Sequence, residues 1–178
     1  VLHLARGDHN TPEFQKRSIT GRVPAIEHTG FWLTESQAIV EYLEETFTPP
    51  EHPRALPSQP RVMARARQIL AWLRSDLQNL RKERSTETMF YERRVQPLTR
   101  PAQADANKLV RVVEQLLPEG ATTVFPKWSL VDADLAFMLA RLHLNHDPLP
   151  DRLKKYVESN WKRPSIHAYI AKRRPGHL

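Results

Sequence analysis

The stretch GRVPAIEHTGFWLTESQAIVEYLEETF, residues 21–47, carries the strongest structural signals in the chain. Residues 23–27 form a short extended segment, Thr29-Gly30 is typical of a two-residue hairpin turn, and residues 31–33 indicate the returning strand. We therefore expect a β-hairpin in this stretch.

A helix is predicted to follow this hairpin. Thr34 with Gln37 three residues later has the spacing of a capping box, so we expect the helix to begin at Thr34. The apolar residues after it recur at helical intervals and predict a buried stripe: Ala38, Ile39, Tyr42, Leu43 and Phe47. Residues 48–50, Thr-Pro-Pro, end the helix.

Upstream of the hairpin, the sequence predicts a strand and a short helix. Val1, Leu2 and Leu4 form a strand-like run that ends at Gly7-Asp8. Thr11 can cap a short helix with Pro12 in its first position.

Downstream, residues 49–60 hold Pro49, Pro50, Pro53, Pro57 and Pro60, a density typical of an extended linker. The remainder reads as helical, so we expect an N-terminal domain over 1–48, a linker over 49–60 and an all-α domain over 61–178.

The leucine spacing predicts one long helix from Ala66 to Leu80 and a second through Leu109 to Leu117. A third begins with a capping box, Ser129 to Asp132, and is apolar on most sides, which favours a central position. Two shorter helices, 152–161 and 164–172, finish the chain, the last with Pro164 in its first turn.

Composition excludes several classes of protein. The 178 residues are 40% hydrophobic and 26% charged, as in an ordinary globular protein, and the absence of cysteine removes disulfides, thiolate metal sites and a cysteine nucleophile from this sequence. No window reaches the roughly 18 apolar residues of a membrane span, and the beginning lacks the pattern of a signal peptide. We expect a cytoplasmic protein without a membrane partner.

The net charge of +7 raises the alternative of a basic helical nucleic-acid binder. The basic residues are spread along the chain and mixed with acidic ones, which favours solvated helix faces, so no nucleic-acid partner is expected.

Two short motifs could bind a ligand. Pro24 lacks an N–H at the entry to a strand, so the neighbouring backbone of Val23 can stay free to pair with a ligand. A cis bond between them is one hypothesis, and an ordinary trans proline at a strand edge is the alternative that composition favours. Glu35 and Ser36 lie at a helix N-terminus, which favours an anionic group, while the Glu35 carboxylate suits an ammonium. The pair could hold both ends of an amino-acid zwitterion, and ordinary N-terminal capping is the alternative.

The order of these elements closely resembles the glutathione S-transferase family over essentially the whole chain. The resemblance implies a thioredoxin-like α/β N-terminal domain, here incomplete, followed by an all-α helical-bundle domain. It also implies glutathione as co-substrate, no metal, a small electrophilic or peroxide substrate, a homodimer, and roles in detoxification and stress response. The runs 65–69, 72–77 and 128–135 are most similar to the bacterial YfcF-type branch.

By position, the resemblance assigns the family's cis-proline to Pro24 and the backbone contact with the cysteinyl part of glutathione to Val23. It assigns the grip on the γ-glutamyl end to Glu35 and Ser36. It places contacts to the glycine carboxylate at His9 and Asn10. Arg22 is an additional polar contact.

The family's catalytic Tyr, Ser or Cys follows its first strand, so the resemblance puts the catalytic residue upstream of Val1 and leaves it unassigned. By the same reasoning, a strand, a helix and two loops of roughly 25–35 residues are expected there. A non-catalytic binding or assembly protein of the same fold is the alternative function.

Other candidates have structural interpretations. His143, His146 and Asp147 could form a metal site, and their position favours a helix C-terminus. The cluster Met89, Phe90 and Tyr91 could line an electrophile pocket, and core packing is the alternative. We expect core or domain-interface positions for three tryptophans, Trp72, Trp128 and Trp161. The C-terminal basic run from Lys172 to Arg174 is expected to be solvated.

Overall fold

The computed structural model describes residues 6–172 and 174, which form two compact units divided between Arg54 and Ala55. We call them the N-terminal unit and the helical unit and describe each by itself. The division falls inside the proline-rich segment 49–60. The strand predicted at Val1–Leu4 lies outside the described residues.

The N-terminal unit is built around the predicted hairpin. A 3₁₀ turn, η2 (Asp8–Asn10), and helix α1 (Pro12–Arg17) precede strands β1 (Ala25–His28) and β2 (Phe31–Thr34), and helix α2 (Ser36–Thr46) follows. The strands pair antiparallel, and the turn residues Thr29 and Gly30 have φ values of 51° and 84°. Two positive φ values define a turn whose twist matches that of the strands. The hairpin prediction is confirmed.

The start of α1 is confirmed and the start of α2 is corrected. The Thr11 side chain accepts a hydrogen bond from the Phe14 N–H, and Pro12 lies in the first turn of α1. Thr34 does not cap α2, because it is the last residue of β2 and its hydroxyl accepts a hydrogen bond from Thr20. Glu35 is the N-cap instead.

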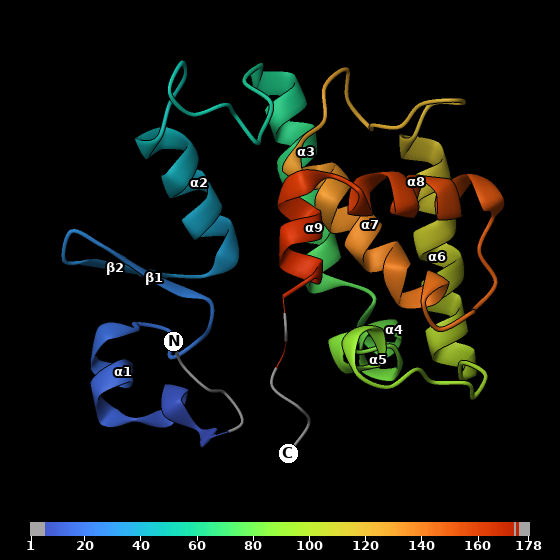
Figure 1. The fold of residues 1–178 in the computed structure, drawn as a ribbon, viewed down its shortest axis with the longest axis horizontal. Helices are drawn as coiled ribbons and strands as arrows, with labels where there is room; N and C mark the ends of the chain where they lie inside the picture. Colours follow the sequence, from blue (N-terminus) through green and yellow to red (C-terminus); the bar gives the residue numbers. More distant parts are fainter. Residues whose placement is uncertain (1–5, 173, 175–178) are drawn as a thin grey trace. The chain divides into compact units, whose positions relative to one another are not determined.

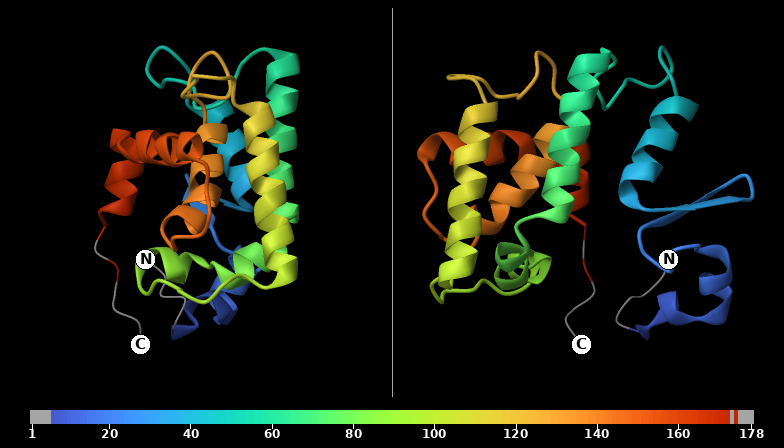
Figure 2. Two further views of the ribbon diagram at one scale, coloured as in Figure 1. Left: turned by 90° about the vertical axis from the view of Figure 1, so that its right-hand side faces the viewer. Right: turned by 180° about the vertical axis from the view of Figure 1, so that it is seen from behind.

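The helical unit surrounds one central helix (Figure 1, Figure 2). Helix α7 packs against α3, α5, α6 and α8, and its buried face fills the core, as its all-round apolarity predicted. The elements are α3 (Pro60–Ser75), α4 (Gln78–Glu83), α5 (Thr86–Phe90), α6 (Arg100–Leu116), α7 (Leu130–His143), α8 (Asp151–Trp161) and α9 (Pro164–Ile170).

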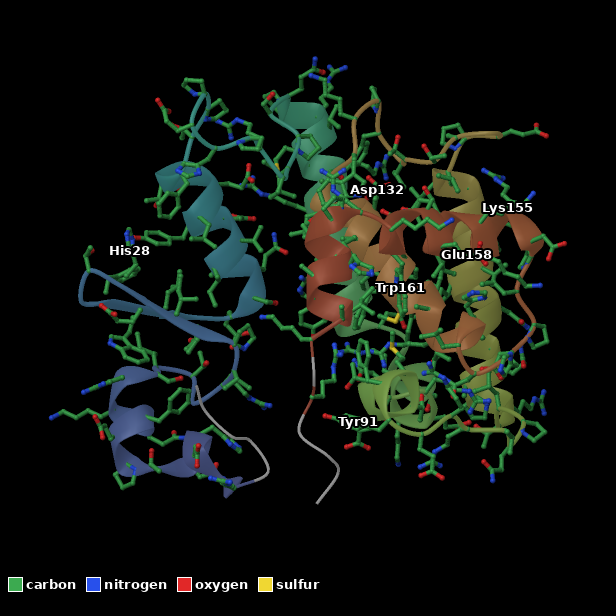
Figure 3. All side chains as sticks on the ribbon, in the orientation of Figure 1. His28, Tyr91, Asp132, Lys155, Glu158 and Trp161 are labelled. Atoms are coloured by element: carbon green, nitrogen blue, oxygen red, sulfur yellow. The ribbon has the colours of Figure 1, made fainter. Side chains whose placement is uncertain are left out.

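The predicted capping box at the start of α7 is confirmed. Asp132 accepts hydrogen bonds from the Ser129 N–H at 2.9 Å, the Val124 N–H at 2.8 Å and the Tyr156 hydroxyl at 2.9 Å. Figure 3 shows Asp132 at the upper end of α7. Burial, followed by the neighbouring Asp132 charge, raises the pKa of Tyr156, so this hydroxyl stays protonated and serves as a donor.

The single long helix predicted from Ala66 to Leu80 is wrong. The chain leaves the helix at Asp76, and Leu77 adopts a left-handed conformation with φ of 62° before α4 begins. The Asp76 carboxylate accepts hydrogen bonds from the Leu77 N–H and the Trp72 indole, both at 2.8 Å. Both leucines at this break, Leu77 and Leu80, are still fully buried. Their helical spacing therefore reflects the burial of both side chains and does not indicate one continuous helix.

The tryptophans and the C-terminal basic run differ in part from expectation. Trp72, Trp128 and Trp161 are half-buried, so they are not core residues, and their alternative domain-interface position stays a prediction. Trp128 donates to Asn160 at 2.9 Å, and the Arg163 guanidinium stacks 3.6 Å from its ring centre.

Within the C-terminal basic run, Lys172 is exposed, whereas Arg174 is half-buried and stacks 3.6 Å from the ring centre of Phe90. Arg173 lies outside the described residues. Across residues 6–172, we find no helix of the length and apolarity that a bilayer crossing requires.

Candidate functional site

The open end of the hairpin brings the two predicted ligand motifs together. Ala25 pairs with Thr34 across the strands, so Val23-Pro24, which enters β1, and Glu35-Ser36, which leaves β2, lie at the same end. The Val23-Pro24 bond is cis, as hypothesised. No described residue hydrogen-bonds to the Val23 backbone. Its N–H and C=O are therefore available for a ligand.

Helix α2 begins at this same end. Its first turn has backbone N–H groups without partners inside the helix, and such groups favour an anion. Glu35 is exposed and has φ of 70° and ψ of 112°, a positive φ that is uncommon outside glycine. Positions of this kind cost energy and cluster at ligand sites. Ser36, the first helical residue, is half-buried.

The loop that carries Arg22 is folded against the hairpin. The Thr20 hydroxyl donates to the Thr34 hydroxyl at 3.0 Å, and the Ser18 hydroxyl donates to the Arg22 carbonyl at 3.4 Å. The Arg22 side chain is exposed. These contacts fix the backbone beside Val23 and leave the Arg22 guanidinium free to reach a ligand.

Gln15 is a positioning residue that our sequence reasoning missed. Its Nε2 donates to the His9 carbonyl at 2.9 Å, and its Oε1 would lie 2.7 Å from a Cβ added to Gly21. Gly21 has φ of 63°, a backbone conformation that favours glycine. Gln15 thus lies between η2 and the loop before Val23. Its place in the α1 sequence was the only feature that could have identified it.

The two residues predicted for a glycine carboxylate lie on η2. Asn10 is exposed, and His9 is half-buried with a buried Nδ1 that has no hydrogen-bond partner among the described residues. An imidazole nitrogen of this kind can donate to or accept from a ligand. Gln15, which donates to the His9 carbonyl, also lies beside Gly21 in the loop that leads to Arg22 and Val23.

Aromatic contacts set the position of α2 on the hairpin. The Tyr42 hydroxyl and His28 Nδ1 are 2.7 Å apart, and the ring centres of Phe31 and Tyr42 are 5.5 Å apart. Figure 3 shows His28 on the hairpin facing the side of α2. Because α2 is docked in this way, its N-terminus and Ser36 stay beside the end of β2.

The remaining candidates from the sequence, the metal site and the electrophile pocket, do not form a second reaction centre among the described residues. No group of metal-ligating side chains occurs in the described part of the chain, and Asp147 instead pairs with Arg84. Met89 is buried, as the core interpretation expected, whereas Tyr91, which follows α5 in Figure 3, is 44% exposed. Phe90, Phe137 and Tyr169 form an aromatic cluster with ring centres 6.0 to 6.4 Å apart.

Comparison with known proteins identifies the class. Residues 1–51 match the glutathione S-transferase N-terminal domain, and residues 60–174 match the glutathione S-transferase C-terminal domain. The chain therefore belongs to the glutathione S-transferase family. Its fold is that family's thioredoxin-like N-terminal and helical C-terminal architecture, as predicted.

Individual relatives support this assignment. A glutathione transferase homologue from Burkholderia, solved with bound glutathione, is 35% identical, with a TM-score of 0.69 over 88% of this chain and 74% of its own. Maleylacetoacetate isomerase of Mus musculus is 29% identical over 147 residues, which cover 81% of this chain and 66% of the relative. Glutathione S-transferase 1 of Dianthus caryophyllus is 43% identical over 53 residues, 30% of this chain. That match spans only 23% of the Dianthus protein's length. The YfcF-type branch stays a prediction.

Proposed function

We propose that this protein is a glutathione transferase that binds glutathione at the end of the hairpin. The observation that carries the proposal is the meeting of the Val23-Pro24 backbone with the N-terminus of α2 at Glu35-Ser36. The glutathione bound in the Burkholderia relative supports this ligand.

In this proposal, each motif recognises one part of the tripeptide. The Val23 backbone pairs with the cysteinyl unit as an added strand would. The Glu35 carboxylate accepts hydrogen bonds from the γ-glutamyl ammonium, while the Ser36 hydroxyl and the first N–H groups of α2 donate to its carboxylate. His9 and Asn10 bind the glycine carboxylate, and Arg22 adds a polar contact.

The proposed chemistry uses the glutathione thiolate as nucleophile. Its sulfur forms a bond to an electrophilic carbon and the leaving group departs with the bonding pair, or it attacks a peroxide oxygen and breaks the O–O bond. In the second case, another glutathione completes the reduction and the disulfide is the oxidised product. We assign no residue that activates the sulfur, so a non-catalytic glutathione-binding protein is the alternative.

The proposal also includes a cytoplasmic homodimer without a metal. Sedimentation at micromolar concentration should give twice the subunit mass, and a monomer would contradict the dimer.

Calorimetric titration with glutathione tests the binding site. Glu35→Gln and Ser36→Ala should each weaken binding by about tenfold, because each loses a charge-assisted hydrogen bond. Glu45→Gln is the matched control, since Glu45 is an exposed carboxylate on the same helix, and its affinity should equal that of the original protein. Unchanged affinity in the Glu35 and Ser36 variants would contradict the site.

Turnover assays then separate catalysis from binding. The protein should conjugate glutathione to 1-chloro-2,4-dinitrobenzene or consume cumene hydroperoxide, and Glu35→Gln should reduce the rate at low glutathione concentration. Binding with no turnover of either substrate would favour the non-catalytic alternative.

A further inference from the structure

The helical unit contains an open groove of about 1050 Å³ that the proposed glutathione site does not use. One face of α6 forms one wall, the loop between α7 and α8 forms another, and Arg93 and Lys154 come from neighbouring segments. We call it the basic groove after its cationic and imidazole side chains: Arg93, Arg111, Lys154, His143 and His146.

Its charges favour an anion. Arg93, Arg111 and Lys154 line the groove together with two carboxylates, Glu114 and Asp147. Arg84, which is almost fully buried, neutralises Asp147 through bonds of 2.6 and 2.7 Å. Three cations against the remaining carboxylate of Glu114 leave an excess of positive charge.

Several of these side chains are free to bind. The side chains of Arg111 and His146 make no hydrogen bond or ion pair with any described residue. Lys154 contacts Asp151 at 2.8 Å and His143 contacts Glu158 at 3.6 Å. Both of these carboxylates are more than half exposed, and Figure 3 shows Glu158 on α8. Exposed pairs of this kind are weak, so a ligand can compete for both cationic partners.

The loop wall is held in place before any ligand arrives. Asn145 is buried and donates to the Arg141 carbonyl at 2.8 Å, while its Oδ1 accepts from the Arg94 N–H at 2.7 Å. The Asp147 N–H donates to the Leu142 carbonyl at 3.0 Å. Between them, His146 has φ of 61°, a positive value for a residue with a side chain. A wall fixed in this way lowers the entropy lost on binding.

The groove also has apolar and amide surfaces. Val110, Leu144 and Leu149 contribute apolar area, and Gln103 and Asn107 contribute amides. Its volume lies just above the range for small-molecule sites, roughly 300–1000 Å³. A compact organic ligand suits it better than a bare inorganic ion.

We propose that the basic groove binds a small organic dianion, either a dicarboxylate or a phosphate monoester. Two acidic groups on an apolar body match the excess of positive charge, the imidazoles and the apolar walls. Arg111 on α6 and Lys154 on α8 contact the acidic groups from two sides, and His146 adds a donor. Arg93, whose Nη1 donates to the Thr88 and Met89 carbonyls, adds positive charge.

Isothermal titration calorimetry with two probes tests the proposal and identifies the ligand chemistry. Glutarate is the dicarboxylate and phenyl phosphate the phosphate monoester, each compared with a monoanion of similar size, butyrate or benzoate. We expect one dianion to bind at least about tenfold more tightly than its monoanion, with affinity that falls as salt is added. Arg111→Gln and Lys154→Gln should each reduce that affinity by about tenfold.

Arg65→Gln is the matched control, because Arg65 is an exposed arginine on α3 outside the groove and the substitution changes net charge equally. It should leave dianion binding unchanged. Circular dichroism establishes that each variant is folded. The proposal is overturned if neither dianion binds, if monoanions bind equally well, or if Arg65→Gln weakens binding as much as Arg111→Gln.

Discussion

At the scale of single residues, Arg84 and Asp147 form a buried ion pair. Arg84 is 2% exposed and binds Asp147 through two parallel hydrogen bonds, and its Nη2 also donates to the Gln96 carbonyl at 2.8 Å. A bidentate pair is geometrically specific. It joins the end of α4 to the α7–α8 loop, two segments far apart in the sequence.

Asp147→Ala should lower the free energy of unfolding by about 3–5 kcal/mol, because the Arg84 guanidinium stays buried without its partner. Urea unfolding followed by circular dichroism measures the change. Asp151→Ala is the control, since it removes only an exposed partner of Lys154 and should lower the free energy of unfolding far less than Asp147→Ala. Equal losses of unfolding free energy in Asp147→Ala and Asp151→Ala would show that the buried pair contributes no more to stability than the exposed pair.

At the scale of elements, two carboxylates, Asp76 and Asp105, hold the break between α3 and α4. Asp76 receives hydrogen bonds from Lys108 on α6, the Leu77 N–H and the Trp72 indole. Asp105 on α6 caps α4 by accepting from the N–H groups of Asn79 and Leu80, at 2.9 and 3.1 Å. The break is therefore held by contacts with α6, and helical spacing within 66–80 could not reveal it.

The hydrogen bond from Lys108, then those from Leu77 and Trp72, hold the pKa of Asp76 below its ordinary value of 3.8. A lowered pKa in the folded state stabilises the protein above pH 3.8, and this contribution is lost as the pH falls through the lowered value. Asp76→Asn should therefore be less stable than the original protein at pH 7, with a smaller difference near pH 3.

Urea unfolding at both pH values measures this difference. Glu119→Gln, at an exposed position in the loop after α6, serves as control and should change stability little at either pH. A stability difference for Asp76→Asn that is constant from pH 7 to pH 3 would contradict the assignment.

At the scale of the whole molecule, the helical unit has its own core and its own N-terminal anchor. Leu56 is 3% exposed, and the Ala55 carbonyl accepts a hydrogen bond of 2.7 Å from the Leu130 N–H at the start of α7. Part of the segment predicted as a linker is therefore packed into this unit.

A fragment from Ala55 to Leu178 should fold alone, with helical circular dichroism and a single cooperative urea transition. A fragment that begins at Ser58 loses Leu56 and the Ala55 carbonyl, and should be less stable by about 2–5 kcal/mol, as for loss of a buried leucine. Equal stability of the two fragments would contradict the anchoring role of residues 55–56.

Sequence patterns alone determined the local elements whose signals lie close together in the chain. The turn at Thr29-Gly30, the cap at Thr11 and the capping box from Ser129 to Asp132 are set by neighbouring residues, because turn geometry and capping bonds span only a few positions. The family resemblance came from the order of such elements, and the comparisons show it.

Tertiary structure decided where distant segments meet. The pairing of Ala25 with Thr34 carries Val23 and Ser36 to one end of the hairpin, and Gln15 reaches both His9 and the loop at Gly21. Asp147, first considered as a metal ligand, is instead the partner of Arg84 sixty-three positions away. Contacts of this range depend on how buried faces pack in three dimensions, and a spacing rule within one helix or turn contains no information about them.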